Sequence, residues 1–349
     1  MRTIADAPVR GGEAPARLRH RGPAVLVLLL ALTGAAALLS IAVGTRTIGP
    51  AAVWTALLDT GLGSEEAVIV RSLRLPRTVL GLLAGLALGI AGALMQGHTR
   101  NPLGDPGLLG VTAGASLAVV LAISVLDVAT PAGYVWFAFA GALAGTVLVY
   151  AIGTAGRGAP TPVTLALAGA ALSALLYAIV RAVLVSDSQT LDAFRFWVVG
   201  GLAGRGADVA AQVAPFIAAG AVLALANAPA LNLLAFGEDV ARALGSRIWP
   251  ARAVGLAAIT LLCGAATAAC GPIAFVGLVA PHVVRAFTGP DHRWLVPASG
   301  LLGAVLLLTA DVLGRVVARP GELPAGIVLA LVGAPFFIAL VRRARTARL

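Results

Sequence analysis

The sequence predicts an all-α polytopic membrane protein with about ten transmembrane helices. Of its 349 residues, 59% are hydrophobic and only 11% are charged, and the mean hydropathy of +0.97 is too high for a soluble domain. Runs of about 20 apolar residues recur along the chain, and each is long enough to cross a bilayer as a helix. The aromatic content is 5%, and the runs lack the alternation that a membrane β-barrel needs. We therefore expect one helical bundle over residues 23–341.

The distribution of positive charge fits a membrane bundle. The net charge is +10, and all 25 basic residues are arginines, which cluster at the ends of apolar runs as the positive-inside rule predicts. Membrane topology therefore explains the charge better than a nucleic-acid partner does. Because a Walker A phosphate-binding loop requires a lysine, we expect no ATP hydrolysis by that route in this chain.

Few side chains are candidates for chemistry. The sequence has no HExxH motif, and His98, His282 and His292 are spread over separate connections, so we expect no metal site, no cofactor and no enzymatic activity. Cys263 and Cys270 lie two helical turns apart within an apolar run. We expect both to be small buried hydrophobic residues.

The first half of the chain is expected to contain six spans. Residues 1–22 form an Arg-rich tail in the cytoplasm, and residues 24–43 form the first span, since the runs that follow disfavour a cleaved secretory signal. The second span is expected to begin at Pro76, because proline is tolerated in the first turn of a helix. A turn-rich segment, residues 96–110, leads into the third span. The next three spans are expected at residues 133–152, 164–186 and 208–226.

Two features of this half leave alternatives open. Thr112 and Ser116 lie among small residues of the third span, where they favour either close helix packing or a polar pathway. Arg71, Arg74 and Arg77 fall on the expected outer face, against the positive-inside rule. Their guanidinium groups either pair with carboxylates of a partner or anchor lipid headgroups.

A charged island, residues 232–245, separates two long apolar runs. Glu238 and Asp239 suit a helix N-terminus, Arg242 follows at the i,i+4 spacing, and Gly245 can close the helix in the left-handed conformation. A helix this short needs a surface to pack on, either a partner or its own protein and lipid. The residues expected to form its apolar stripe are Leu234, Val240, Ala241 and Leu244.

The second half is expected to contain four more spans. A seventh span, residues 253–269, breaks at Gly271-Pro272, and the ninth carries Asp311 and Arg315 at i,i+4, where the two charges neutralise each other. An even number of spans places both termini, including the tail at residues 342–349, in the cytoplasm. The eighth, ninth and tenth spans are expected at residues 273–280, 295–317 and 324–340. The amphipathic segment before the sixth span, residues 189–205, is expected at the outer interface.

Five motifs in this order resemble the FecCD-type permeases, which are the membrane subunits of ATP-binding-cassette importers for iron siderophores, haem and cobalamin. The resemblance runs from about Arg46 to the C-terminus and leaves the N-terminal tail outside the family core. The motifs are Arg74-Leu-Pro-Arg77, Asn101-Pro-Leu-Gly-Asp-Pro-Gly-Leu-Leu-Gly110, Gly237-Glu-Asp-Val-Ala-Arg-Ala-Leu-Gly245, Gly271-Pro-Ile-Ala-Phe-Val-Gly-Leu-Val-Ala-Pro-His282, and Glu322-Leu-Pro-Ala-Gly with Gly333-Ala-Pro335.

The resemblance implies a type II importer bundle like that of the cobalamin-importer permease. It implies ten helices per subunit and a dimer with a second permease copy or sister permease. It also implies two cytoplasmic ATP-binding subunits, an external solute-binding protein and a surrounding lipid bilayer. The expected cargo is an iron(III)-siderophore complex, with cobalamin or haem as the alternative. An ion-coupled secondary transporter is disfavoured because the spans offer few ionisable residues beyond Asp311.

The resemblance also implies roles for particular residues. The helix that couples to the ATPase, within a loop at about residues 227–250, comprises Gly237, Glu238, Asp239, Arg242, Leu244 and Gly245. The residues expected to dock the binding protein are Arg74, Arg77 and Arg315. The residues expected to line the translocation path are Ala168, Ala171, Leu172 and Leu175 on the fifth span and Thr112 and Ser116 on the third.

Overall fold

The computed structural model describes residues 21–44, 48–58, 65–128, 130–155 and 162–346. This part of the chain is helical throughout and contains no strand, which confirms the predicted fold class. The N-terminal tail expected at residues 1–22 falls almost entirely outside the described residues. At the other end of the chain, the last helix continues to Thr346, so most of the expected C-terminal tail is an extension of that helix.

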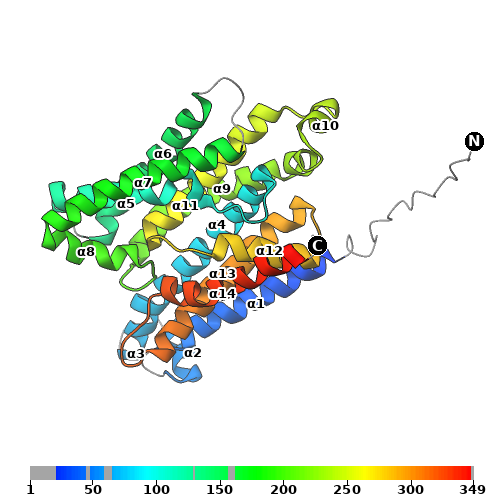
Figure 1. Cartoon of the computed structure of the whole chain (residues 1–349). Coiled ribbons are helices and arrows are strands. Elements are labelled where there is room, and N and C mark those ends of the chain that lie inside the picture. The colour runs from blue at the N-terminus through cyan, green and yellow to red at the C-terminus, as the bar shows by residue number, and fades with distance from the viewer. Residues whose placement is uncertain (1–20, 45–47, 59–64, 129, 156–161, 347–349) are drawn as a thin grey trace, which may run out of the picture.

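Ten helices correspond to the ten predicted spans (Figure 1). Seven helical stretches are long and apolar enough to cross a membrane, while α5, α12 and the apolar part of α14, Ala325–Ala339, are shorter. The ten are α1 (Gly22–Ala42), α4 (Leu75–Thr99), α5 (Val111–Leu126), α6 (Pro131–Thr154), α7 (Pro162–Ser186), α9 (Ala207–Leu234), α11 (Ile248–Cys270), α12 (Val276–Thr288), α13 (His292–Val317) and α14 (Ala325–Thr346).

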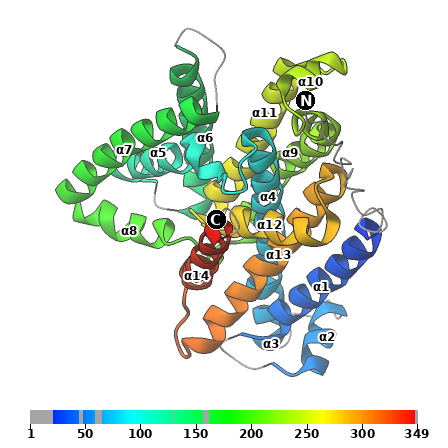
Figure 2. The ribbon, with the colours of Figure 1, turned by 45° about the vertical axis from the view of Figure 1, so that its right-hand side comes forward.

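The helices pack in three groups, and α4 belongs to the central one. Helices α5 to α7 lie on one side, α1 and α12 to α14 lie on the other, and α4, α9 and α11 lie between them (Figure 2). In the most hydrophobic stretch of the helix that contains α4, 78% of the residues are buried, against 22% in that of α1. Helix α4 is therefore the core helix, and most residues of α1 are not buried. Cys263 and Cys270 are both buried on α11, as predicted.

Glycines allow α4 to approach its neighbours closely. A Cβ atom placed on Gly89 would lie 2.1 Å from the carbonyl oxygen of Ser299 on α13, and one on Gly92 would lie 1.8 Å from that of Gly277 on α12. Helices in a bilayer gain packing energy when small residues let their backbones meet. These glycines therefore set the spacing between α4, α12 and α13.

Replacing Gly92 by alanine is expected to destabilise the bundle, because the added methyl group can be accommodated only if α4 and α12 move apart. Overpacking of this kind costs about 1–3 kcal/mol. The matched control is Gly34→Ala on α1, where nothing lies within 4 Å of the added atom. Thermal unfolding of the purified variants checks the contrast. Equal melting temperatures would mean that the α4–α12 contact is not tight.

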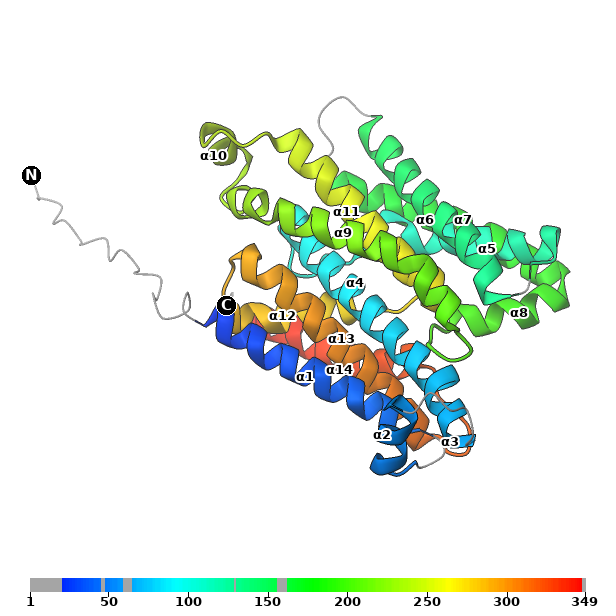
Figure 3. The ribbon, with the colours of Figure 1, turned by 180° about the vertical axis from the view of Figure 1, so that it is seen from behind.

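Short helices mark the two ends of the bundle. Helix α10 (Glu238–Ala243) lies at one end, and α2 (Pro50–Leu58), α3 (Glu65–Val68) and α8 (Ser188–Val198) lie at the opposite end (Figure 3). The start of α1 and the end of α14 lie at the α10 end. Asp187 caps α8 by accepting hydrogen bonds from the Thr190 hydroxyl and from the backbone N–H groups of Thr190 and Gln189, which lowers the pKa of its carboxyl group below the usual range.

The predicted start of the second span is wrong. One continuous helix runs from Glu65 to Thr99 and passes through a π-helical stretch, Ile69–Arg74, before Pro76. A proline removes one helical hydrogen bond and pushes against the preceding turn, and a π-type bond from Leu75 N to Val70 O widens that turn. The helix therefore accommodates the proline and does not begin at it.

Three other predicted boundaries are also corrected. Helix α9 continues through Pro229 to Leu234, which shortens the loop that carries α10 to residues 235–247. Helix α12 starts at Val276 and continues through Pro281 to Thr288. Prolines are tolerated inside membrane helices because neighbouring helices and side chains satisfy the freed backbone groups. The segment around Trp54, between the first two spans, forms helix α2.

Candidate functional site

Helix α10 is a rigid projection between α9 and α11. Gly237 has φ 101° at its N-terminus, and Gly245 has φ 83° just after its C-terminus, as the sequence predicts for Gly245. The N–H of Gly245 donates to the carbonyl of Arg242 at 2.9 Å, and that of Ser246 donates to Ala241 at 2.9 Å. This pair of bonds is a Schellman cap, which fixes the end of a helix that is too short to persist alone.

Charged side chains hold α10 against α11. Arg242 pairs with Glu238 at 3.2 Å, which confirms the predicted i,i+4 pair, and with Asp239 at 3.0 Å. Glu238 also pairs with Arg252 on α11. Glu238 therefore links Arg242 of α10 to Arg252 of α11.

The predicted apolar stripe of this segment is divided between two faces. Leu234 and Ala241 are buried in the bundle, whereas Val240 and Leu244 are 46% and 61% exposed. Phe236, which the sequence analysis missed, lies in the turn just before α10 and is 72% exposed. Phe236, Val240 and Leu244 together form an apolar knob, a term used below for these three residues. Exposed apolar groups gathered on a rigid projection are typical of a protein-binding surface.

The base of the loop is bound to the neighbouring helices by asparagines of α9. The amide of Asn232, expected at the start of the charged island, donates from Nδ2 to Asp291 at 2.7 Å, and its Oδ1 accepts from the N–H of His292 at 2.9 Å. Asn227 Nδ2 donates to Nε2 of His98 on α4 at 3.0 Å. The histidines of this end therefore join helices to one another.

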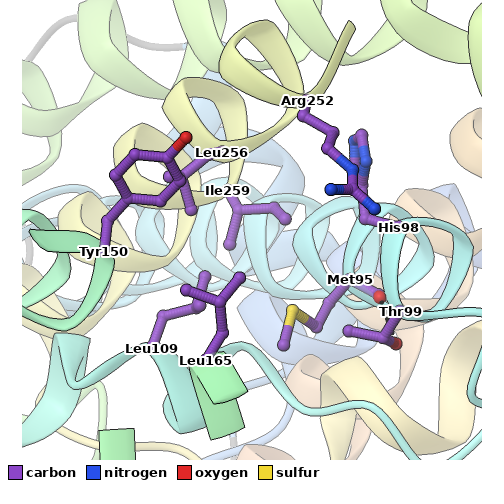
Figure 4. A pocket seen from close by; sticks show the side chains of 9 residues that line it. All are labelled: Met95, His98, Thr99, Leu109, Tyr150, Leu165, Arg252, Leu256 and Ile259. Carbon is purple, nitrogen blue, oxygen red and sulfur yellow. Dashed lines mark hydrogen bonds between the residues drawn. The ribbon is translucent and has the colours of Figure 1, made fainter. Parts of the chain in front are cut away.

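A small cavity of about 70 Å³ lies beside the first half of α11 (Figure 4). Arg252 and His98 stand side by side at one side of it, across from Tyr150, with Met95 and Ile259 nearby. Its walls come from α4, α6, α7 and α11. Arg252, which pairs with Glu238 of α10, thus also lines this cavity between the core helices.

At the opposite end, two arginines surround a buried carboxylate. Arg77 donates to Asp311 through Nε at 3.0 Å and Nη2 at 2.8 Å, and through Nη1 to Glu322 at 2.7 Å. Arg315 pairs with Asp311 at 3.1 Å, which confirms that predicted pair. The bond from Arg77 to Asp311 joins residues 234 positions apart and could not be inferred from local spacing.

Arg74 and Arg315 also cap the end of α1. Arg74 Nη1 donates to the carbonyls of Ile41 and Ala42 at 2.8 and 2.7 Å, and Arg315 Nη1 donates to Ser40 and Val43 at 3.0 and 2.8 Å. The last carbonyls of a helix have no partner within the helix, so cationic donors stabilise them. Both arginines are buried as a result, with 5% and 2% of their surface exposed.

The structure brings the three predicted docking arginines together around one cavity, here called the outer cavity. Its volume is about 540 Å³. The polar residues that line it are Ser72, Arg74, Arg77, Arg205, Arg315 and Glu322.

The predicted path residues do not share one surface. Ala168 and Leu172 are buried in a cluster between α5, α6 and α7, and Ser116 is fully buried with its hydroxyl donating to the carbonyl of Thr112 at 2.8 Å. Ala171 is exposed and Leu175 is 58% exposed, although the i, i+3, i+4, i+7 spacing places both on the same face of α7 as Ala168 and Leu172. Packing against α5 and α6 therefore covers part of this face and leaves Ala171 and Leu175 accessible.

The chain is similar to known transport permeases over most of its length. The profile of the FecCD transport family matches residues 29–343. The ferric enterobactin transport permease FepD of Escherichia coli is 46% identical over 92% of this chain and 94% of its own length. The hemin transport permease HmuU of Yersinia pestis is 37% identical over 89% of this chain and 94% of its own.

A solved structure gives the same result in three dimensions. An inward-facing structure described as a metal-chelate type ABC transporter superimposes with a TM-score of 0.80 at 28% identity, covering 92% of this chain and 99% of that chain. The family match extends from within α1 to within α14 and includes α10 and the residues that line the outer cavity. The chain is a member of the FecCD transport family.

Proposed function

We propose that this chain is the membrane-spanning permease subunit of an ATP-binding-cassette importer for an iron(III)-siderophore complex. Several relatives that match 81% or more of this chain carry iron-chelate names, among them ferric enterobactin, Fe(3+)-citrate and iron(3+)-hydroxamate permeases. Cobalamin and haem are the alternative cargoes, because the related permeases BtuC of Halobacterium salinarum and HmuU carry those names. Two ATP-binding subunits and an external binding protein complete the proposed complex.

The apolar knob on α10 is the observation that carries this proposal. A rigid projection with exposed Phe236, Val240 and Leu244 suits insertion into a cleft of a partner, here an ATP-binding subunit. The α10 end of the bundle then faces the cytoplasm of the cell that carries this protein in its inner or plasma membrane, and the start of α1 and the end of α14 lie on that side.

The proposed mechanism follows from the contacts of α10. Closure of the two ATP-binding subunits around ATP moves the knob, and the Glu238–Arg252 pair passes this movement to α11. Helix α9, at the other end of the α10 loop, passes the movement to α4 and to the start of α13, because its Asn227 and Asn232 bind them. ATP changes which side is open because the ATP-binding subunits hold α10 differently in their two states.

The outer cavity is the proposed recess for the binding protein. Arg74, Arg77 and Arg315 give it a positive surface that suits acidic residues of a partner, which steers the encounter and fixes its register. Arg74 and Arg315 also hold the end of α1, so part of their role is to keep the recess in shape. The path is proposed to lie between two permease copies, along the face of α7 that carries Ala171 and Leu175.

Uptake by cells tests the proposed cargo. Cells that lack this gene are supplied with a panel of radio-iron siderophores and, in parallel, with labelled cobalamin and haem. We expect loss of uptake of one siderophore, restored by the intact gene. Lost cobalamin or haem uptake with normal iron uptake would replace the cargo and keep the architecture.

A further inference from the structure

Arg205, in the loop between α8 and α9, differs from the other arginines of the outer cavity. Only 9% of its surface is exposed, its Nη1 donates to the hydroxyl of Tyr134 on α6, and its guanidinium carbon lies 5.6 Å from the centre of that ring. Its Nε is buried without a hydrogen-bond partner. Among the described residues, no carboxylate lies within ion-pair distance of Arg205. A buried cation without a counter-charge is costly and therefore needs an explanation.

The neighbouring arginines already have strong acceptors. Arg77 binds Asp311 and Glu322, and Arg74 and Arg315 bind the carbonyls that end α1. An oxyanion that enters the cavity has to compete with those acceptors at all three. At Arg205 no carboxylate or carbonyl acceptor competes, because its one hydrogen bond among the described residues is the bond from Nη1 to the Tyr134 hydroxyl.

The shape of the guanidinium group defines what fits there. Because Nη1 is occupied by Tyr134, the free edge of Arg205 is the one formed by Nε and Nη2. This edge presents two parallel N–H groups that match the two oxygens of a carboxylate, and Arg77 binds Asp311 through the same edge. The cavity of about 540 Å³ falls within the size range of small-molecule sites, which are about 300–1,000 Å³.

We infer that the outer cavity is a binding site for a carboxylate, which Arg205 receives through Nε and Nη2. The inference goes beyond the proposed docking role, which concerns Arg74, Arg77 and Arg315. A carboxylate can come from a free small molecule that enters the outer mouth or from an acidic side chain of the binding protein. The chemistry is the same in both cases, and two arms of one experiment distinguish the sources.

The first arm uses the purified full-length permease in nanodiscs without any partner. Tricarballylate, a tricarboxylate that lacks the iron-binding hydroxyl of citrate, is titrated by calorimetry. Charge-assisted hydrogen bonds of this kind contribute enough that Arg205→Gln is expected to weaken binding by at least about tenfold. Arg205→Lys keeps the charge but loses the two-pronged edge, and is also expected to bind more weakly. Arg181→Gln, an exposed arginine on α7, is the matched control and should bind like the wild type.

The second arm measures docking of the binding protein to the same four proteins. If tricarballylate does not bind but Arg205→Gln and Arg205→Lys weaken docking, the carboxylate belongs to the binding protein and the site stands. The inference is overturned if tricarballylate binds equally to wild type and both Arg205 variants. It is also overturned if the Arg205 variants keep the wild-type melting temperature and neither tricarballylate binding nor docking depends on Arg205. The first arm needs neither ATP nor uptake, so its result is independent of the proposed import function.

Discussion

Replacing Asp311 by asparagine is expected to lower the free energy of unfolding by about 3–5 kcal/mol, the cost of leaving buried charges unpaired. Asp311 is fully buried and pairs with both Arg77 and Arg315, so its loss leaves the buried Arg315 without a carboxylate and leaves Arg77 with Glu322 alone. The asparagine keeps the volume of the side chain, which separates the charge effect from a cavity. Unfolding of the purified protein in mixed micelles measures the change.

The matched control for Asp311 is Glu322→Gln. Glu322 pairs with the same Arg77, but its side chain is 32% exposed, so this variant is expected to lose no more than about 1 kcal/mol. Equal stability of Asp311→Asn and wild type would contradict the structural role assigned to the buried cluster. Docking of the binding protein should also weaken in Asp311→Asn, since Arg77 and Arg315 would no longer hold their positions.

Replacing Phe236 by alanine is expected to weaken assembly with the ATP-binding subunit by about 2 kcal/mol, or roughly 30-fold in affinity, as for a central aromatic anchor. Phe236 is exposed on a loop whose end is fixed by the Schellman cap, so the loss falls on the contact and not on the fold. Binding of the purified ATP-binding subunit to permease nanodiscs measures the change.

Phe196→Ala provides a closely matched control for this prediction. Phe196 is also 72% exposed but lies on α8 at the other end of the bundle. Its removal should leave assembly with the ATP-binding subunit unchanged. If both variants assembled as well as wild type, α10 would not be the contact with the ATPase.

The number of spans could be predicted from the sequence, while several of their ends could not. Hydropathy and length identify ten apolar runs, and Gly271-Pro272 separates α11 from α12 as predicted. We expected one span to begin at Pro76 and two others to end before Pro229 and Pro281, but each of these prolines lies within a continuous helix. Proline ends a helix in water more reliably than in a packed membrane bundle, where neighbours satisfy the freed carbonyl groups.

The candidate sites could be predicted only where the pattern is local. The Arg242–Glu238 pair and the turn at Gly245 follow from spacing along one helix, and both are present. The contact of Arg77 with Asp311 depends on the packing of α4 against α13, which no local pattern encodes. The cover over α7 is likewise set by packing, since Ala168 and Leu172 are buried while Leu175 on the same face is exposed.

The central claim is that ATP hydrolysis drives import through α10. Its most direct test is radio-iron siderophore uptake by proteoliposomes that contain this permease and its ATP-binding subunit, with the loaded binding protein outside. We expect accumulation that requires ATP at the ATP-binding subunit and that falls in a Glu238→Ala, Arg242→Ala double variant. Accumulation driven by a proton or sodium gradient without ATP would contradict the account and indicate a secondary transporter.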